Sequence, residues 1–112
     1  MKKDPDRTRA IAAFIKYADA GCPKDEDAIC YDSEDACDIY AINGMFEYLD
    51  REGKEYISKA VREVYMFFPR TGKRHTSSRV LAYAMRAYAD ERTVYRWLSY
   101  AAKVFTKLRE SL

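Results

Sequence analysis

The chain has 112 residues, of which 48% are hydrophobic and 34% are charged. This composition is typical of a globular protein and excludes a disordered one. The length predicts one compact domain whose core needs neither a metal nor disulfides. No stretch approaches the roughly 18 uninterrupted apolar residues of a membrane span, and the N-terminus lacks the apolar region of a signal peptide. We therefore expect a cytoplasmic protein that does not enter a membrane.

The charges are divided unevenly along the chain. The net charge is +2, but residues 1–60 carry nine Lys and Arg against fourteen Asp and Glu, whereas residues 61–112 carry eleven against four. We therefore divide the single helical domain, residues 1–112, into an acidic part of unassigned role, residues 1–59, and a basic part, residues 60–112. A basic half can attract a polyanion locally even when the whole chain is nearly neutral. The alternative is segregation of surface charge by chance.

The three cysteines, Cys22, Cys30 and Cys37, form no C-x-x-C pair, and the single histidine, His75, is distant in sequence. Such a set predicts reduced, partly buried thiols. One alternative is a zinc site completed by carboxylates, and another is a disulfide with one free thiol in an exported protein. The acidic residues between 25 and 35 lack the spacing of a calcium-binding loop. We therefore expect neither a metal nor a cofactor.

Apolar residues recur at helical spacing in five segments, and no segment alternates convincingly with the period of two that a strand needs. Capping residues, glycines and prolines set the expected helices to about residues 5–20, 33–52, 54–68, 77–88 and 91–112. Residues 24–35 predict a linker or turn. Within the second helix, Asn43-Gly44 favours a turn, which leaves open one strained helix or two short ones.

Each predicted helix has an apolar face that we expect to point inward. The members are Ile11, Phe14, Ile15 and Ala18 in the first; Ala36, Ile39, Asn43, Phe46 and Leu49 in the second; Ile57, Ala60, Val61, Val64 and Phe68 in the third; Val80, Leu81, Ala84 and Tyr88 in the fourth; and Val94, Trp97, Leu98, Ala101, Phe105 and Leu108 in the fifth. The fold class expected from these faces is all-α, a five-helix bundle.

The last two helices have the features of a helix-turn-helix. Ala84 provides a small residue where the two helices would touch, and Asp90 predicts the N-cap of the last helix. Tyr88-Ala89 stands where the turn of such motifs often has a glycine. A plain helical hairpin is the alternative. We predict a C-terminal helix-turn-helix, because a helix anchored on one side and basic on the other is what the major groove of DNA accepts.

The candidate DNA-binding side chains follow from the order in which a recognition helix meets DNA. They are Arg74, Ser78, Arg79, Arg92, Thr93, Tyr95, Arg96 and Lys103. Arg92 and Arg96 are the expected base readers, because a guanidinium group matches the acceptors of guanine. The residues before and at the start of the fourth helix are expected to hold phosphates. Lys103, with Lys107, is expected either to reach a flanking phosphate or to be merely solvated.

Three segments together resemble a known family: Ala60-Val61-Arg62-Glu63-Val64-Tyr65, Arg79-Val80-Leu81-Ala82-Tyr83-Ala84 and Glu91-Arg92-Thr93-Val94-Tyr95-Arg96-Trp97-Leu98. They resemble small phage-type transcriptional regulators of the late-gene activator kind, found in bacteria with low-GC genomes. Those regulators are similar in turn to the promoter-reading region-four domain of sigma factors. The resemblance covers the C-terminal half only. It implies promoter DNA as ligand and RNA polymerase as a partner.

The sequence does not predict an enzyme, because the chain has one histidine and neither a nucleophile elbow nor a phosphate-binding loop. The function that we expect is a sequence-specific, double-stranded DNA-binding transcriptional regulator, phage- or mobile-element-derived, with a homodimer as one arrangement of two reading helices. The alternative is a protein-binding module whose acidic face docks on a host or phage protein.

Overall fold

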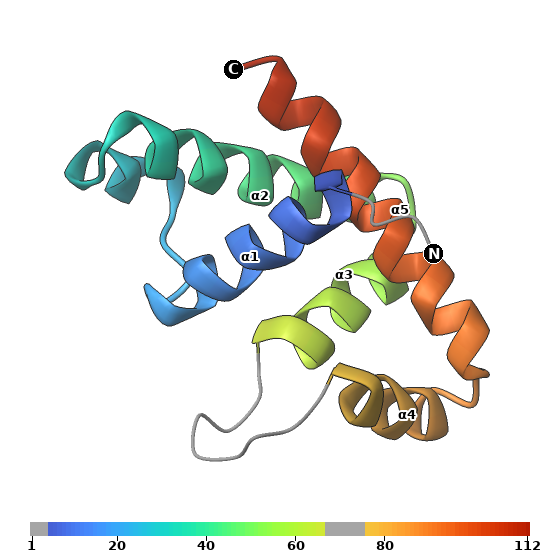
Figure 1. Cartoon of the computed structure of the whole chain (residues 1–112). Coiled ribbons are helices and arrows are strands. Elements are labelled where there is room, and N and C mark those ends of the chain that lie inside the picture. The colour runs from blue at the N-terminus through green and yellow to red at the C-terminus, as the bar shows by residue number, and fades with distance from the viewer. Residues whose placement is uncertain (1–4, 67–75) are drawn as a thin grey trace.

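The computed structural model of the chain describes residues 5–66 and 76–112. All regular structure in these two ranges is helical (Figure 1). The elements in chain order are α1 (Pro5–Asp19), the 3-10 helix η1 (Asp25–Cys30), α2 (Ser33–Arg51), α3 (Glu55–Val61), the π-helical stretch η2 (Arg62–Met66), α4 (Thr76–Arg86) and α5 (Glu91–Glu110). The expected all-α class is confirmed, and a 3-10 helix occupies part of the segment predicted as a linker.

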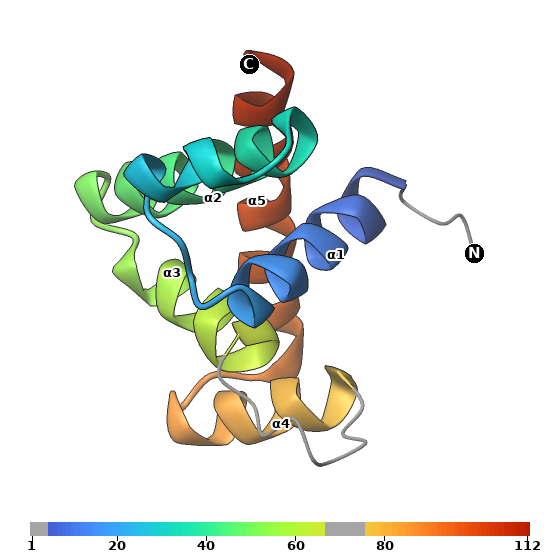
Figure 2. The same ribbon diagram turned by 90° about the vertical axis from the view of Figure 1, so that its left-hand side faces the viewer.

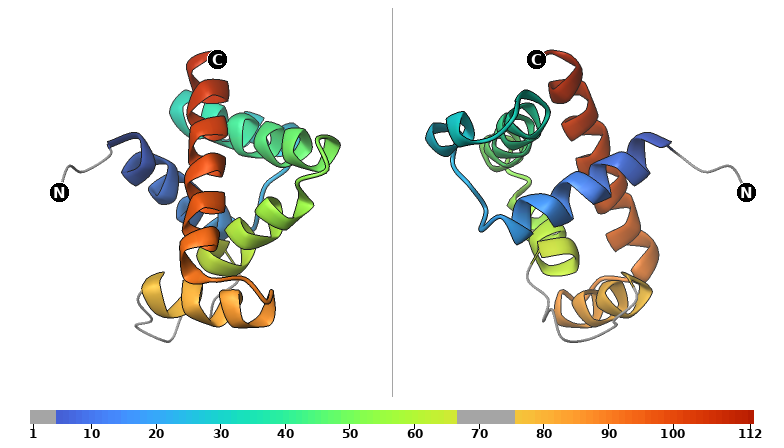
Figure 3. Two further views of the ribbon diagram at one scale, coloured as in Figure 1. Left: turned by 90° about the vertical axis from the view of Figure 1, so that its right-hand side faces the viewer. Right: turned by 60° about the vertical axis from the view of Figure 1, so that its left-hand side comes forward.

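The long helix α5 is the centre of the fold. It packs against α1, α2, α3 and α4, and the side views show the other helices arranged along it (Figures 2 and 3). α4 lies across the N-terminal end of α5, whereas α2 lies across its C-terminal part (Figure 3). Both the acidic and the basic part of the sequence therefore pack on the same helix and form one body.

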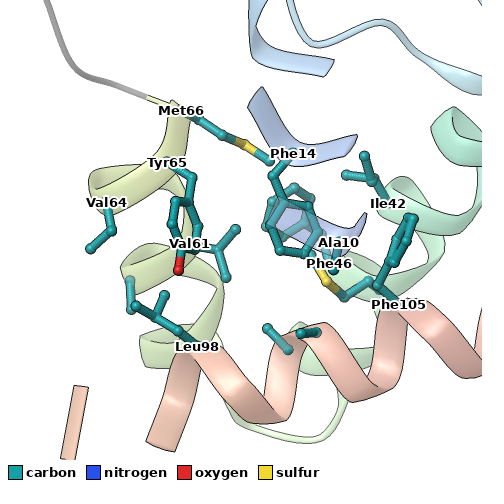
Figure 4. Packing of buried hydrophobic residues seen from close by; sticks show 14 of the residues in the cluster. Ala10, Phe14, Ile42, Phe46, Val61, Val64, Tyr65, Met66, Leu98 and Phe105 are labelled. Atoms are coloured by element: carbon teal, nitrogen blue, oxygen red, sulfur yellow. The ribbon is translucent and has the colours of Figure 1, made fainter. Parts of the chain in front are cut away.

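Three aromatic rings join elements that are far apart in sequence. Phe14 of α1 lies between Tyr65 of η2, at 6.0 Å between ring centroids, and Phe105 of α5, at 5.6 Å. All three side chains are at most 1% exposed, and Figure 4 shows them among the buried aliphatic residues. Buried aromatic pairs contribute about 0.5 to 1.5 kcal/mol each beyond the burial of their area. The position of α5 is therefore fixed by packing with the first and middle parts of the chain.

Most of the predicted inward faces are confirmed. The predicted third helix divides into α3, which buries Ile57, Ala60 and Val61, and η2, which buries Val64. α5 buries Val94, Leu98, Ala101 and Phe105, whereas the predicted Trp97 and Leu108 are half-buried. Phe68 lies outside the described residues. In α1 the buried face is centred on Ala10, Ala13, Phe14 and Tyr17, with Ile11, Ile15 and Ala18 at its half-buried edge. The predicted inward face of α1 is therefore rotated about the helix axis relative to the observed one.

The predicted inward face of α4 was wrong at two of its four positions. Val80 and Ala84 are buried as expected, but Leu81 is 46% exposed and Tyr88 is 98% exposed. Tyr83 is buried instead, at 5% exposure. Within the described residues, α4 packs on η2 and α5, and its buried residues are Val80, Tyr83 and Ala84. Tyr88 lies beyond the end of α4 at Arg86, where its φ of +55° takes it out of the helical face.

The second helix is continuous through Asn43-Gly44. The Nδ2 group of Asn43 donates to the Pro23 carbonyl over 3.1 Å and to Asp25 Oδ1 over 2.9 Å. Its Oδ1 accepts from the Tyr17 hydroxyl over 2.6 Å. A Cβ atom on Gly44 would lie 3.4 Å from Leu108 Cδ1, so the glycine permits close approach of α5. Tertiary contacts thus hold as helix a pair that by itself favours a turn.

Capping groups define the helix ends. The Asp90 carboxylate accepts from the Thr93 backbone amide over 2.7 Å, as predicted, at the start of α5. The cap of α2 is Asp32, which accepts from the amide of Asp35 over 2.9 Å. Gly53 has φ +74° between α2 and α3. In the described ranges, no helix combines the length and the apolar character needed to cross a membrane.

Candidate nucleic-acid interface

Residues 87–90 connect α4 to α5 in a tight turn. Tyr88 has φ +55°, in the left-handed region that side chains rarely adopt. This is the turn at which we expected glycine to be replaced by Tyr88-Ala89. The turn ends at Asp90, the N-cap of α5. The Thr93 amide donates to its carboxylate and holds the pKa of Asp90 below its ordinary value. The turn therefore sets the direction of the first residues of α5.

The basic residues of α5 lie on the side opposite its buried side. Arg92, Arg96, Lys103 and Lys107 are all exposed, whereas Val94, Leu98, Ala101 and Phe105 are all buried. We call these four cations the basic stripe. Within residues 5–66 and 76–112 no ion pair involves them. The described part of the N-terminal half thus leaves this face of α5 open.

Two other cations of the basic part form ion pairs with acidic residues of the same chain. Arg86 of α4 donates to Glu63 Oε2 over 2.8 Å. Arg109 of α5 donates from Nε to Asp38 Oδ1 over 2.8 Å and from Nη2 to Glu34 Oε2 over 2.7 Å. Acidic residues of α2 therefore neutralise the last cation of α5, while the basic stripe remains available to solvent.

The remaining predicted contact residues have mixed positions. Ser78 is exposed on the first turn of α4, which begins at Thr76. Arg79 is half-buried and donates from Nε to the Val64 carbonyl over 2.6 Å, which ties α4 to η2. Arg74 and His75 lie outside the described residues. The structure therefore brings Ser78 and the basic stripe to the surface and gives Arg79 an anchoring contact.

Thr93 and Tyr95 are half-buried at the start of α5. The Thr93 backbone amide is used by the Asp90 cap. The Arg7 guanidinium of α1 lies 5.8 Å from the centre of the Tyr95 ring. Tyr95 is thus placed toward α1, on the flank of α5 and away from the basic stripe.

Aromatic side chains border the basic stripe on its other flank, a feature that sequence reasoning missed. The Trp97 ring contacts Tyr56 edge-on at 5.0 Å between centroids. Lys54 donates to the Tyr100 hydroxyl over 3.2 Å and lies 4.8 Å from the centre of that ring. This hydrogen bond holds the pKa of Tyr100 below its ordinary value. The spacing of Trp97 and Tyr100 along the last helix was visible in the sequence, but their partners, Tyr56 of α3 and Lys54 at its N-cap, were not.

Three large apolar residues are exposed on α4 and in the turn that follows it. Leu81 and Met85 of α4 are 46% and 71% exposed, and Tyr88 of the turn is 98% exposed. Exposed apolar side chains that gather on one face are typical of a contact surface more than of a bare one. We call these three residues the α4 apolar row.

In the described part of the chain, His, Cys, Asp and Glu side chains do not gather in groups of three that could hold a metal ion. Cys22 and Cys37 are half-buried thiols and Cys30 is an exposed one. Burial raises the pKa of Cys22. Comparison of the chain with protein-family models, with curated proteins and with solved structures finds no match.

Proposed function

We propose that this protein is a sequence-specific, double-stranded DNA-binding regulator of transcription that uses α4, the turn and α5 as a helix-turn-helix. The observation that carries the proposal is the exposure of Arg92 and Arg96 near the start of a helix whose opposite side is buried. A recognition helix meets base edges with its N-terminal residues. These two guanidinium groups are one turn apart, so both can face one groove.

The role of each side chain follows from its place on α5. Arg92 and Arg96 read guanine through its O6 and N7 acceptors. Lys103 and Lys107 lie two to three turns further along and contact phosphates, which add affinity but little sequence preference. Ser78 holds a phosphate at the start of α4. Arg79 acts mainly by anchoring α4 to η2 through the Val64 carbonyl.

The resemblance to phage-type late-gene activators and to the sigma-factor region-four domain supports promoter DNA as the ligand. RNA polymerase is the protein partner that this resemblance adds. The α4 apolar row, which lies outside the basic stripe, provides a surface for such a partner. The compartment that fits both partners in a bacterium is the cytoplasm.

The first test is selection of bound fragments from a genomic library, followed by affinity measurement on the enriched duplex. Arg96→Ala should weaken specific binding by about 1 to 3 kcal/mol, because a bidentate contact to guanine is lost. Lys103→Ala should weaken all duplexes nearly equally and reduce the salt dependence by about one phosphate contact.

The matched control is Arg51→Ala, which removes an exposed arginine of α2 that is not part of the basic stripe. We expect this variant to bind like the wild type. The proposal is wrong if no duplex is enriched by the wild-type protein, or if Arg92→Ala combined with Arg96→Ala leaves duplex affinity unchanged.

The second candidate function is a protein-binding module that does not contact DNA. The α4 apolar row favours it, because three large side chains are exposed together without a covering element in the described structure. The same DNA experiment separates the two candidates. Unchanged duplex binding in the double arginine variant would make the protein-binding module the better explanation.

A further inference from the structure

The 3-10 helix η1 exposes an isoleucine among carboxylates. Ile29 is 87% exposed. Asp25, Glu26 and Asp27, which precede it in the same short helix, are exposed as well. Complete burial of an isoleucine side chain is worth about 1.5 to 3 kcal/mol. Contact with another surface that covers Ile29 would therefore be favourable. Such a surface should be apolar at its centre and basic at its edge.

A groove with that character lies between α2 and α5. Its walls are the half-buried side chains of Tyr48, Tyr100, Val104 and Leu108, and Lys103 and Lys107 stand at its edge. Its volume is about 370 Å³, which exceeds the volume of one aliphatic side chain. Lys54, bound to the Tyr100 hydroxyl, adds a cation beside it, and Glu52 lies near the Tyr48 hydroxyl.

We propose that copies of this chain associate head to tail, with Ile29 of one copy in the α2–α5 groove of the next. The carboxylates of η1 would then face Lys103 and Lys107 of the neighbouring copy. Charge complementarity favours a second copy as the occupant. The same chain carries an exposed isoleucine flanked by carboxylates and an apolar groove flanked by lysines. Ile29 and the groove belong to different surfaces, so the contact is heterologous and extends into rings or filaments.

The contact centres on one side chain and a few charges, so it is weak and depends on concentration and on salt. Its detection needs no DNA, and the inference therefore does not rest on the proposed function. Self-association and DNA binding would both use Lys103. Duplex DNA should compete with self-association, whereas Arg92 and Arg96 remain free for DNA in the associated form.

The test is sedimentation velocity of the full chain up to about 1 mM protein, which detects even millimolar association. We expect the mean mass of the wild type to rise with concentration beyond that of a dimer and to fall when salt is added. Ile29→Ser should weaken the association about 10- to 100-fold, which is the fold-change that corresponds to one buried isoleucine. Lys103→Glu combined with Lys107→Glu should weaken it as well.

Mixing the two variants tests the head-to-tail geometry. The Ile29→Ser protein keeps an intact groove, and the double lysine variant keeps an intact Ile29 segment. An equimolar mixture should therefore form a heterodimer that does not grow further, although each variant alone stays monomeric.

Met85→Ser is the matched control, because Met85 is also a strongly exposed apolar residue but belongs to the α4 apolar row. It should associate like the wild type, and far-UV circular dichroism should show equal helix content in all variants. A wild type that stays monomeric over the whole range overturns the proposal. So does association that is lost in Met85→Ser and retained in Ile29→Ser, because the α4 apolar row would then be the interface.

Discussion

Arg109 at the end of α5 donates from Nε to Oδ1 of Asp38 on α2 over 2.8 Å. The Arg109 side chain is only 13% exposed, and a second bond from it reaches Glu34. This cation therefore holds the C-terminal end of α5 against the acidic start of α2. Arg96, about three and a half helical turns earlier on α5, is exposed and has no ion pair within the described residues.

We expect Arg109 to contribute to the stability of the fold and Arg96 to contribute to DNA binding. Arg109→Gln should lower the free energy of unfolding by about 1 to 3 kcal/mol, because it leaves the partly buried Asp38 without its charged partner. It should leave duplex affinity unchanged at temperatures where the variant is folded. Arg96→Ala should do the reverse. Urea denaturation and DNA titration on both variants check this, and equal loss of stability in both would contradict the assignment.

The Tyr17 hydroxyl predicts a stability change at alkaline pH. Burial of Tyr17 raises its pKa from 10.0 to about 12, and its hydroxyl donates to Asn43. Because the folded state favours the neutral phenol, this stabilisation is complete below pH 10 and is lost as the pH rises through 12, by about 3 kcal/mol in total. Denaturation between pH 9 and 12 measures the loss.

Tyr17→Phe is the control for that measurement. It should be less stable at neutral pH, because the Asn43 Oδ1 acceptor loses its donor. Its stability should also fall less steeply above pH 10 than that of the wild type. Parallel curves for the two proteins would show that other tyrosines dominate the alkaline transition.

The Asp90 cap predicts a change at acidic pH with the opposite sign. The Thr93 amide lowers the pKa of Asp90 below its ordinary value of 3.8. Since the folded state favours the carboxylate, its stabilisation is present above about pH 4 and is lost as the pH falls through the lowered pKa. Asp90→Asn retains a capping oxygen without a titrating group. It should remove this acid dependence, whereas Asp90→Ala should destabilise α5 at all pH values; thermal unfolding between pH 2 and 7 distinguishes them.

The backbone at Tyr88 predicts a stabilising substitution. Tyr88 has φ +55° and is 98% exposed, so its side chain contributes almost no burial in the described structure. Tyr88→Gly should raise the free energy of unfolding by about 0.5 to 1 kcal/mol, because relief of left-handed strain exceeds the added freedom of the unfolded chain. Tyr88→Ala is the matched control. It keeps a Cβ atom and should give no gain, and an equal gain in both would place the effect in the side chain.

Local signals in the sequence determined much of the secondary structure. Asp90 caps α5, Gly53 separates α2 from α3, and the apolar spacing of the last helix identified both its buried side and its basic stripe. These features depend on backbone geometry and on helical period, which act within a few residues. The all-α class followed from the same local rules.

Tertiary packing decided what those rules could not reach. Asn43 stays helical because Tyr17, Pro23 and Asp25 satisfy its side chain. Leu81 is exposed because the described neighbours of α4 pack on the side that holds Val80, Tyr83 and Ala84. Tyr88 is exposed because α4 ends at Arg86 and the backbone turns at Tyr88. Arg109 is paired because α2 crosses α5 at the end that carries it, whereas Arg96 is open because it lies on the side of α5 opposite the buried residues. A helical period shows which residues share a face, but only the arrangement of the helices in space determines which faces are covered.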